Sequence, residues 1–126
     1  MTAPPARVIA GRSAAAHDGR MPKYLIEASY TSDGMKGVLD KGGTARREAV
    51  EKMLADVGGT LDSFHFAFGS TDAYVIVDVP DNITAAAIGM AVGATGMVNL
   101  KTTVLLTPED IDRAAAVQTS YTPPGE

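Results

Sequence analysis

The sequence predicts one small α+β domain, in which two strand-helix-strand halves share a single sheet. Three observations predict it. The chain has 126 residues, the usual size of one domain. Several segments alternate between apolar and polar residues, as strands do, and they are separated by segments with a helical apolar stripe. The composition, 45% apolar and 21% charged, also provides enough material for a packed core.

The first half begins with a strand and continues with two helical segments. Alternation predicts a strand from Tyr24 to Tyr30. A short helix is expected between Thr31 and the Gly42-Gly43 pair. Thr44 is expected to cap the main helix, which ends at Gly58-Gly59. The apolar stripe of that helix consists of Val50, Met53, Leu54 and Val57.

The second half begins with a hairpin and continues with a helix. Strands are predicted from Leu61 to Phe68 and from Asp72 to Val79, joined by Gly69-Ser70-Thr71. Asp81 or Asn82 is expected to cap the helix. Its predicted core-facing stripe is Ile83, Ala87, Met90, Ala91 and Ala94.

A final strand and a terminal helix complete the domain. The strand is predicted from Val98 to Leu106, and Thr107-Pro108 begins the helix with a cap residue followed by proline. The resulting order, β-α-β-β-α-β plus a C-terminal helix, predicts a ferredoxin-like sandwich with both crossover helices on one face of the sheet. We expect residues 21–117 to form the domain, 1–20 a disordered N-terminal extension and 118–126 an irregular C-terminal tail.

Strand alternation sorts the side chains onto two faces of the sheet. One face is apolar and is expected under the helices; it collects Ile26, Ala28, Phe64, Phe66, Val75, Val77, Leu100 and Val104. The other face, which we call the mixed face, collects Glu27, Ser29, Ser63, His65, Tyr74, Ile76, Asp78, Lys101 and Thr103. A face with this mixture is expected to be covered. Two copies that stack their mixed faces would form a dimeric α/β barrel able to enclose a small ligand.

Composition disfavours several function classes. The net charge of −4 gives no general attraction to nucleic acids. Apolar stretches fall far short of the ~20 residues that cross a bilayer, so no membrane association is expected. The absence of cysteine excludes disulfides and thiolate metal sites and fits a cytoplasmic protein.

Five segments also resemble a known family. They are MPKYLIEASYT, KGGTARREAVEK, SFHFAFGSTDAYVIVDVPDN, KTTVLLTPEDID and SYTPPG, and together they resemble small bacterial proteins of the GYD domain family. The name-giving segment of that family, Gly-Tyr-Asp or Gly-x-Tyr-Asp, falls on Gly69-Ser70-Thr71-Asp72, where Thr71 replaces the tyrosine. The resemblance implies a ferredoxin-like fold and association as dimeric α/β barrels, but no reaction.

Four residues of the mixed face are candidates for chemistry. Glu27 and Lys101 are expected on neighbouring strands, where an acid beside an ammonium can tune proton transfer; the alternative is a cross-strand ion pair or an oligomer contact. His65 with Tyr74 could supply a general base, although an isolated strand histidine is also a common structural or interfacial group. Ser29, Ser63, Asp78 and Thr103 are the predicted ligand contacts around them.

A second candidate site lies at the start of the main helix. Gly43, Thr44, Arg46 and Arg47 combine free backbone N–H groups, a hydroxyl and two guanidinium groups, which is typical of an anion site. Flexible glycines followed by solvated arginines are the alternative explanation. No metal site and no cofactor are predicted, because the single domain histidine has neither a thiol nor a second histidine at ligand spacing.

Three functional hypotheses follow from this arrangement. The first is a homo-oligomeric protein, at least a dimer, that holds a metabolite or an anion on the mixed face. The second is a cofactor-independent dimeric-barrel enzyme of the monooxygenase or isomerase type, with His65 or Glu27 as base and Tyr74 or Lys101 polarising the substrate. The third is a purely structural, self-assembling protein.

Overall fold

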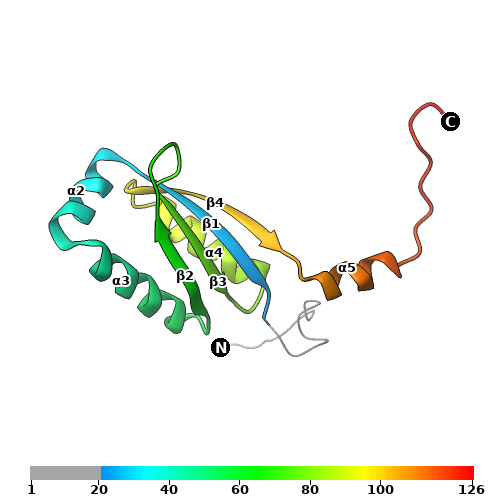
Figure 1. The fold of residues 1–126 in the computed structure, drawn as a ribbon, viewed down its shortest axis with the longest axis horizontal. Helices are drawn as coiled ribbons and strands as arrows, with labels where there is room; N and C mark the ends of the chain where they lie inside the picture. Colours follow the sequence, from blue (N-terminus) through cyan, green and yellow to red (C-terminus); the bar gives the residue numbers. More distant parts are fainter. Residues whose placement is uncertain (1–20) are drawn as a thin grey trace.

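An antiparallel sheet with helices packed on one face forms the body of the structure. The computed structural model describes residues 21–126, so the predicted N-terminal extension lies outside the described residues. The four strands lie in the order β2-β3-β1-β4 (Figure 1). Their bounds are β1 Lys23–Tyr30, β2 Thr60–Phe66, β3 Ala73–Asp78 and β4 Val98–Leu105. The helices are α2 Ser32–Lys41, α3 Gly43–Asp56, α4 Asn82–Gly93 and α5 Pro108–Ala115. The predicted α+β class and the βαββαβ order are confirmed.

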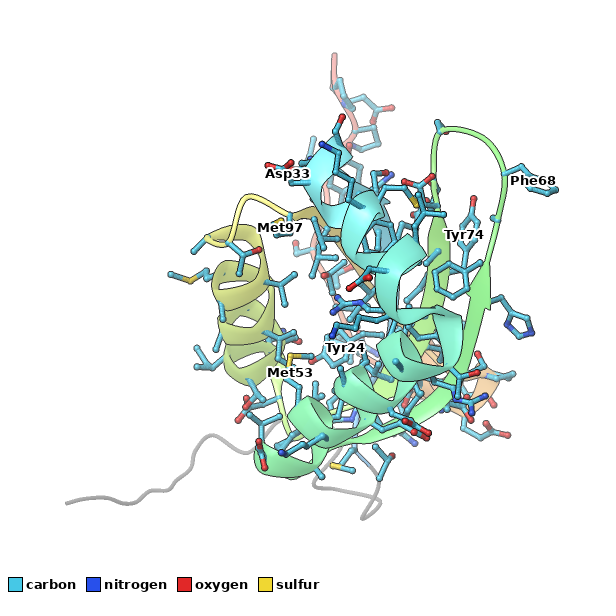
Figure 2. All side chains as sticks on the ribbon, turned by 90° about the vertical axis from the view of Figure 1, so that its left-hand side faces the viewer. Tyr24, Asp33, Met53, Phe68, Tyr74 and Met97 are labelled. Atoms are coloured by element: carbon cyan, nitrogen blue, oxygen red, sulfur yellow. The ribbon has the colours of Figure 1, made fainter. Side chains whose placement is uncertain are left out.

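The core lies between this sheet and the two crossover helices. Leu54 of α3 is fully buried, and Ile88 of α4 is 5% exposed. They pack with residues from β1, β3 and β4 and with Val79, which follows β3; the strand residues are Tyr24, Ile26, Ala28, Ala73, Val75, Val77 and Val98. The Oη atom of Tyr24 also donates a hydrogen bond of 2.5 Å to Asn82 Oδ1, which ties the central strand to the start of α4. In Figure 2, Tyr24 and Met53 lie between α3 and α4.

Gly42 separates the first two helices. Its φ of 90° lies in the left-handed region that glycine adopts without steric cost, and it ends α2. The same residue is the N-cap of α3 and offers no side-chain hydrogen bond. The prediction that Thr44 caps this helix is therefore wrong, because the helix begins one residue before Thr44.

The predicted core-facing stripe of α4 is wrong, because most of its residues face solvent. Ile83 and Met90 are 79% and 75% exposed, whereas Ile88 is buried and Ala85 and Val92 pack against the core. Ala87, Ala91 and Ala94 are exposed as well. The reason is that no charged residue occurs between Asn82 and Gly93, so both sides of this helix are apolar and periodicity alone cannot select the inner one.

The helices leave the two edges of their face partly open. Phe66 on β2 and Val104 on β4 were expected in the core but are 44% and 49% exposed. A groove of about 360 Å³ runs between α4 and β4, where α4 presents the small residues Ala86 and Gly89. Phe68 was expected in β2, but it lies beyond the strand, fully exposed at the tip of the hairpin (Figure 2).

The C-terminal helix stands apart from this body. Figure 1 shows α5 and the segment after it extending away beyond the end of β4, and α5 has no buried residue. Its start is nevertheless well formed. The N–H of Asp110 donates to Thr107 Oγ1 at 3.0 Å, and the N–H of Thr107 donates to Asp110 Oδ2 at 2.9 Å. Over residues 21–126, no helix has both the length and the apolar character needed to cross a membrane.

Candidate functional site

The four residues predicted to carry chemistry form one row across the sheet. Strand register places Glu27 opposite Tyr74 on β3 and opposite Lys101 on β4, and it places Tyr74 opposite His65 on β2. Directly opposite residues on antiparallel strands share a face, with Cβ atoms about 4.5–5.5 Å apart. The row therefore runs His65, Tyr74, Glu27, Lys101, with one residue from each of the four strands.

A second row, largely apolar at its centre, lies beside the first. Leu25 is opposite both Ile76 and Thr103, and Ile76 is opposite Ser63. Two of the predicted ligand contacts, Ser63 and Thr103, thus border the first row at opposite edges of the sheet. Leu25 was not among the predicted site residues, although its position in the alternation of β1 places it on this face. Together the two rows form a surface with an aliphatic centre and polar groups around it.

The other two predicted contacts are already occupied within the chain. Asp78 lies at the far end of the face, where its carboxylate oxygens are 3.0 and 3.1 Å from the Nζ atom of Lys23. Ser29 lies on the other side of the Glu27 row and donates from Oγ to the carbonyl oxygen of Ser70 at 2.9 Å. Neither side chain is positioned like Ser63 and Thr103, which directly flank the aliphatic centre.

The turn between β2 and β3 contacts Glu27, in the middle of the row. Asp72 Oδ2 accepts a hydrogen bond of 2.8 Å from the N–H of Tyr30, at the end of β1. The hydroxyl of Thr71 donates a long hydrogen bond of 3.5 Å to Glu27 Oε1. Glu27 and Lys101 are neighbours, yet among the described residues no ion pair involves either side chain. The ion-pair interpretation therefore does not hold within one chain, and both charged groups remain available to other partners.

The predicted anion cluster divides into an inner and an outer part. Arg46 turns toward β1, where its Nε atom donates to Tyr30 Oη at 3.3 Å and its guanidinium lies 5.8 Å from the centre of the Tyr30 ring. Thr44 and Arg47 are exposed. Gly43 packs against the ring of Phe66, and a Cβ added there would lie 3.0 Å from it. Of the four predicted residues, Arg46 lines a cavity of about 350 Å³, which Lys41 also lines.

Two titratable groups of β1, Lys23 and Tyr24, have raised pKa values. Hydrogen bonding to Asp78 raises the pKa of Lys23, and Asp62 adds to the effect while partial burial opposes it. Burial raises the pKa of Tyr24, and the nearby charge of Asp81 raises it further. Within the part of the chain that the structure describes, no group of three or more histidine or acidic side chains is arranged to hold a metal ion.

Comparison with known proteins identifies one relationship. A family model described as the GYD domain matches residues 24–115, from the first strand to the end of α5. No curated protein and no solved structure matches the chain.

Proposed function

The chain belongs to the GYD domain family, and we propose that it is a homo-oligomeric protein that holds a small molecule on the mixed face of its sheet. The observation that carries the proposal is the row His65, Tyr74, Glu27, Lys101, which crosses all four strands beside an aliphatic centre. Binding sites combine an apolar surface with a few polar groups that fix orientation, and the two rows provide both.

Stacking of two copies would complete the site. The strand order β2-β3-β1-β4 with helices on one face is that of a ferredoxin-like sandwich, and among the helices of residues 21–126 none packs on the opposite face. A two-fold pair is self-complementary, so each row would face an equivalent row of the partner. We infer a dimeric α/β barrel, in which Leu25 and Ile76 supply the apolar contact and the row lines the enclosed space.

The ligand favoured by this surface is a small, partly apolar metabolite, including one with an anionic group. Lys101 and His65 lie at the two ends of the row and supply donors, while Glu27 supplies an acceptor at its centre. An apolar body would lie over Leu25 and Ile76. A cytoplasmic location and the absence of nucleic-acid and membrane partners belong to the same proposal.

Native mass spectrometry of the purified chain tests assembly. We expect an even-numbered oligomer that the Leu25→Lys variant converts to monomers, because a charge at the centre of the stacked faces would be desolvated. Leu39→Lys is the matched control, since Leu39 is 79% exposed on α2 and away from this face. A monomeric wild-type chain, or an unchanged oligomer of the Leu25→Lys variant, would refute the stacking.

The same measurement tests ligand binding. We expect the wild-type oligomer to exceed the mass of its polypeptides by a retained small molecule, and Lys101→Met to lose that mass while the oligomer persists. Lys36→Met is the control, because Lys36 is an exposed residue of α2. An oligomer without any retained molecule would reject the binding function and favour the purely structural alternative.

One further feature of the row supports an enzyme as the second candidate. Tyr74 lies between His65 and Glu27, so a phenol has a possible base on either side. In this hypothesis His65 or Glu27 removes a proton, and Tyr74 or Lys101 polarises the substrate, without a cofactor. The retained molecule would then differ between the wild type and Glu27→Gln or His65→Ala, because the variants would hold unconverted substrate. Identical molecules in all three proteins would rule this chemistry out.

A further inference from the structure

A cavity of about 350 Å³ lies on the helix side of the sheet, away from the mixed face. It is bordered by α2, the first turns of α3 and the segment that leads into β4. Asp33 on α2 and Met97 in the segment before β4, both labelled in Figure 2, are among its lining residues. Most of its wall is apolar, with contributions from Val38, Ala49 and Val98. Its volume falls within the range of small-molecule sites, about 300–1,000 Å³.

The fold itself keeps this cavity in place. The N–H of Thr31 donates to the carbonyl oxygen of Met97 at 2.9 Å, and its hydroxyl donates to that of Gly96 at 3.0 Å. Gly34 approaches the same carbonyl so closely that an added Cβ would lie 2.0 Å from the Met97 oxygen. One end of α2 is thereby fixed against the segment before β4. Further along α2, a Cβ added to Gly37 would find no atom within 4 Å, so the helix leaves space there.

The charged groups around the cavity favour one negative charge. Arg46 donates through Nε to Tyr30, and among the described residues no carboxylate forms an ion pair with its guanidinium. Its Nη atoms therefore remain available as a two-pronged donor. Lys41, whose contact with Asp40 is at 4.0 Å between exposed groups, adds a second positive charge at the rim. Among residues 21–126, Asp33 is the only acid in the lining, so these lining residues carry a net charge of +1.

We propose that this cavity binds a small organic monoanion, specifically a carboxylate with an apolar body. The guanidinium of Arg46 would pair with both carboxylate oxygens, and its 3.3 Å hydrogen bond from Nε to Tyr30 Oη holds it at the cavity for that purpose. The apolar body would lie against Val38, Ala49 and Val98. The site is separate from the mixed face, so either proposal can fail without the other.

Titration calorimetry with benzoate and hexanoate as probes tests the site. We expect saturable binding of both carboxylates. The neutral analogue benzamide, which lacks the negative charge, and inorganic phosphate, which lacks the apolar body, should each bind at least about ten-fold more weakly. Arg46→Gln should weaken benzoate binding by at least about ten-fold through loss of a charge-assisted pair. Arg47→Gln should leave it unchanged, since Arg47 is the adjacent exposed residue on the same helix.

A cavity-filling variant gives a second line of evidence. Gly37→Leu places a side chain into the open space and leaves Arg46 unchanged, and Leu is a good helix former, so the variant is expected to fold and to lose benzoate binding. Thermal unfolding of each variant confirms that it is folded. Equal binding of benzoate and benzamide, full binding by Arg46→Gln or Gly37→Leu, or no binding of either carboxylate to the wild type would each overturn the proposal.

Discussion

The Nζ atom of Lys23 lies 3.0 Å from the Oδ1 atom of Asp78, and this pair fixes one end of the sheet across β1 and β3. Asp62 on β2 lies 3.2 Å from the same ammonium, so one lysine joins three of the four strands. The Lys23 side chain is 39% exposed, and solvent screening therefore limits its contribution to the free energy of unfolding to about 1 kcal/mol or less. Its main value is to fix the register of the strands.

Stability is expected to fall at alkaline pH. The pKa values of Lys23 and Tyr24 are raised above their ordinary values of 10.5 and 10.0. Below pH 10 both groups keep their protons in the folded and unfolded chains, and above it the unfolded chain loses them first, so the free energy of unfolding decreases as pH rises. Urea unfolding between pH 8 and about 11 measures this decrease. Tyr24→Phe should make this decrease smaller, whereas Tyr121→Phe, at an exposed position, should not. An equal dependence of the free energy of unfolding on pH in the two variants would contradict the role of Tyr24.

Two glycines of α2 are expected to respond oppositely to alanine. Gly34→Ala forces a Cβ to within 2.0 Å of the Met97 carbonyl oxygen and should cost about 1–3 kcal/mol. Gly37→Ala meets no atom within 4 Å and should stabilise the protein by about 0.5–1 kcal/mol, because alanine favours a helix interior over glycine. Thermal unfolding midpoints provide the comparison. Similar midpoints for the two variants would show that α2 does not pack against the segment before β4.

The two isoleucines of α4 test which side of this helix faces the core. Ile88→Ala should destabilise the protein by about 2–5 kcal/mol, since the side chain is buried against the sheet. Ile83→Ala should change the free energy of unfolding of the single chain by no more than about 0.5 kcal/mol, because Ile83 is 79% exposed. Chemical denaturation of both variants gives the values. A larger loss of stability for Ile83→Ala than for Ile88→Ala would mean that Ile83 faces the core, as the sequence predicts.

The N-terminal caps of α4 and α5 should differ in their effect on global stability. The N–H and hydroxyl of Thr84 both donate to Asp81 Oδ1 at 2.8 Å, so Asp81→Ala should cost about 1 kcal/mol of global stability. Thr107→Ala removes the equivalent cap of α5, a helix without buried residues, and should leave the global unfolding midpoint unchanged. Hydrogen exchange of α5 amides should nevertheless accelerate. A lowered midpoint for Thr107→Ala would mean that α5 packs on a body, its own or that of another copy.

The sequence is most informative where two neighbouring patterns constrain each other. The period of two in each strand assigned Glu27, His65, Tyr74 and Lys101 to one face, and hairpin and crossover order determined which strands are neighbours. Those two facts were enough to predict that the four residues gather. They did not give the row itself, which depends on register and on a bulge between Leu61 and Ser63 that alternation does not reveal.

Elsewhere the sequence does not distinguish between equally plausible residues. The α4 segment carries no charge, so nothing in it marks the solvent side, and Ile83 was as good a core candidate as Ile88. At the start of α3, Thr44 has a good capping side chain, but the positive φ of Gly42 decided where the helix begins. Arg46 and Arg47 are adjacent and chemically identical, and nothing in the sequence shows that Arg46 contacts Tyr30 while Arg47 is exposed.

The central position of β1 also has a consequence for biosynthesis. This strand is the first of the sheet to leave the ribosome, yet its two neighbours are β3 and β4, so that Lys23 pairs with Asp78 and Leu105. Pairing between such distant segments requires the closure of long loops, which slows folding. The nascent chain cannot complete its sheet until β4 has been made. Until then, chaperones or transient contacts must shield the apolar residues of β1 from aggregation.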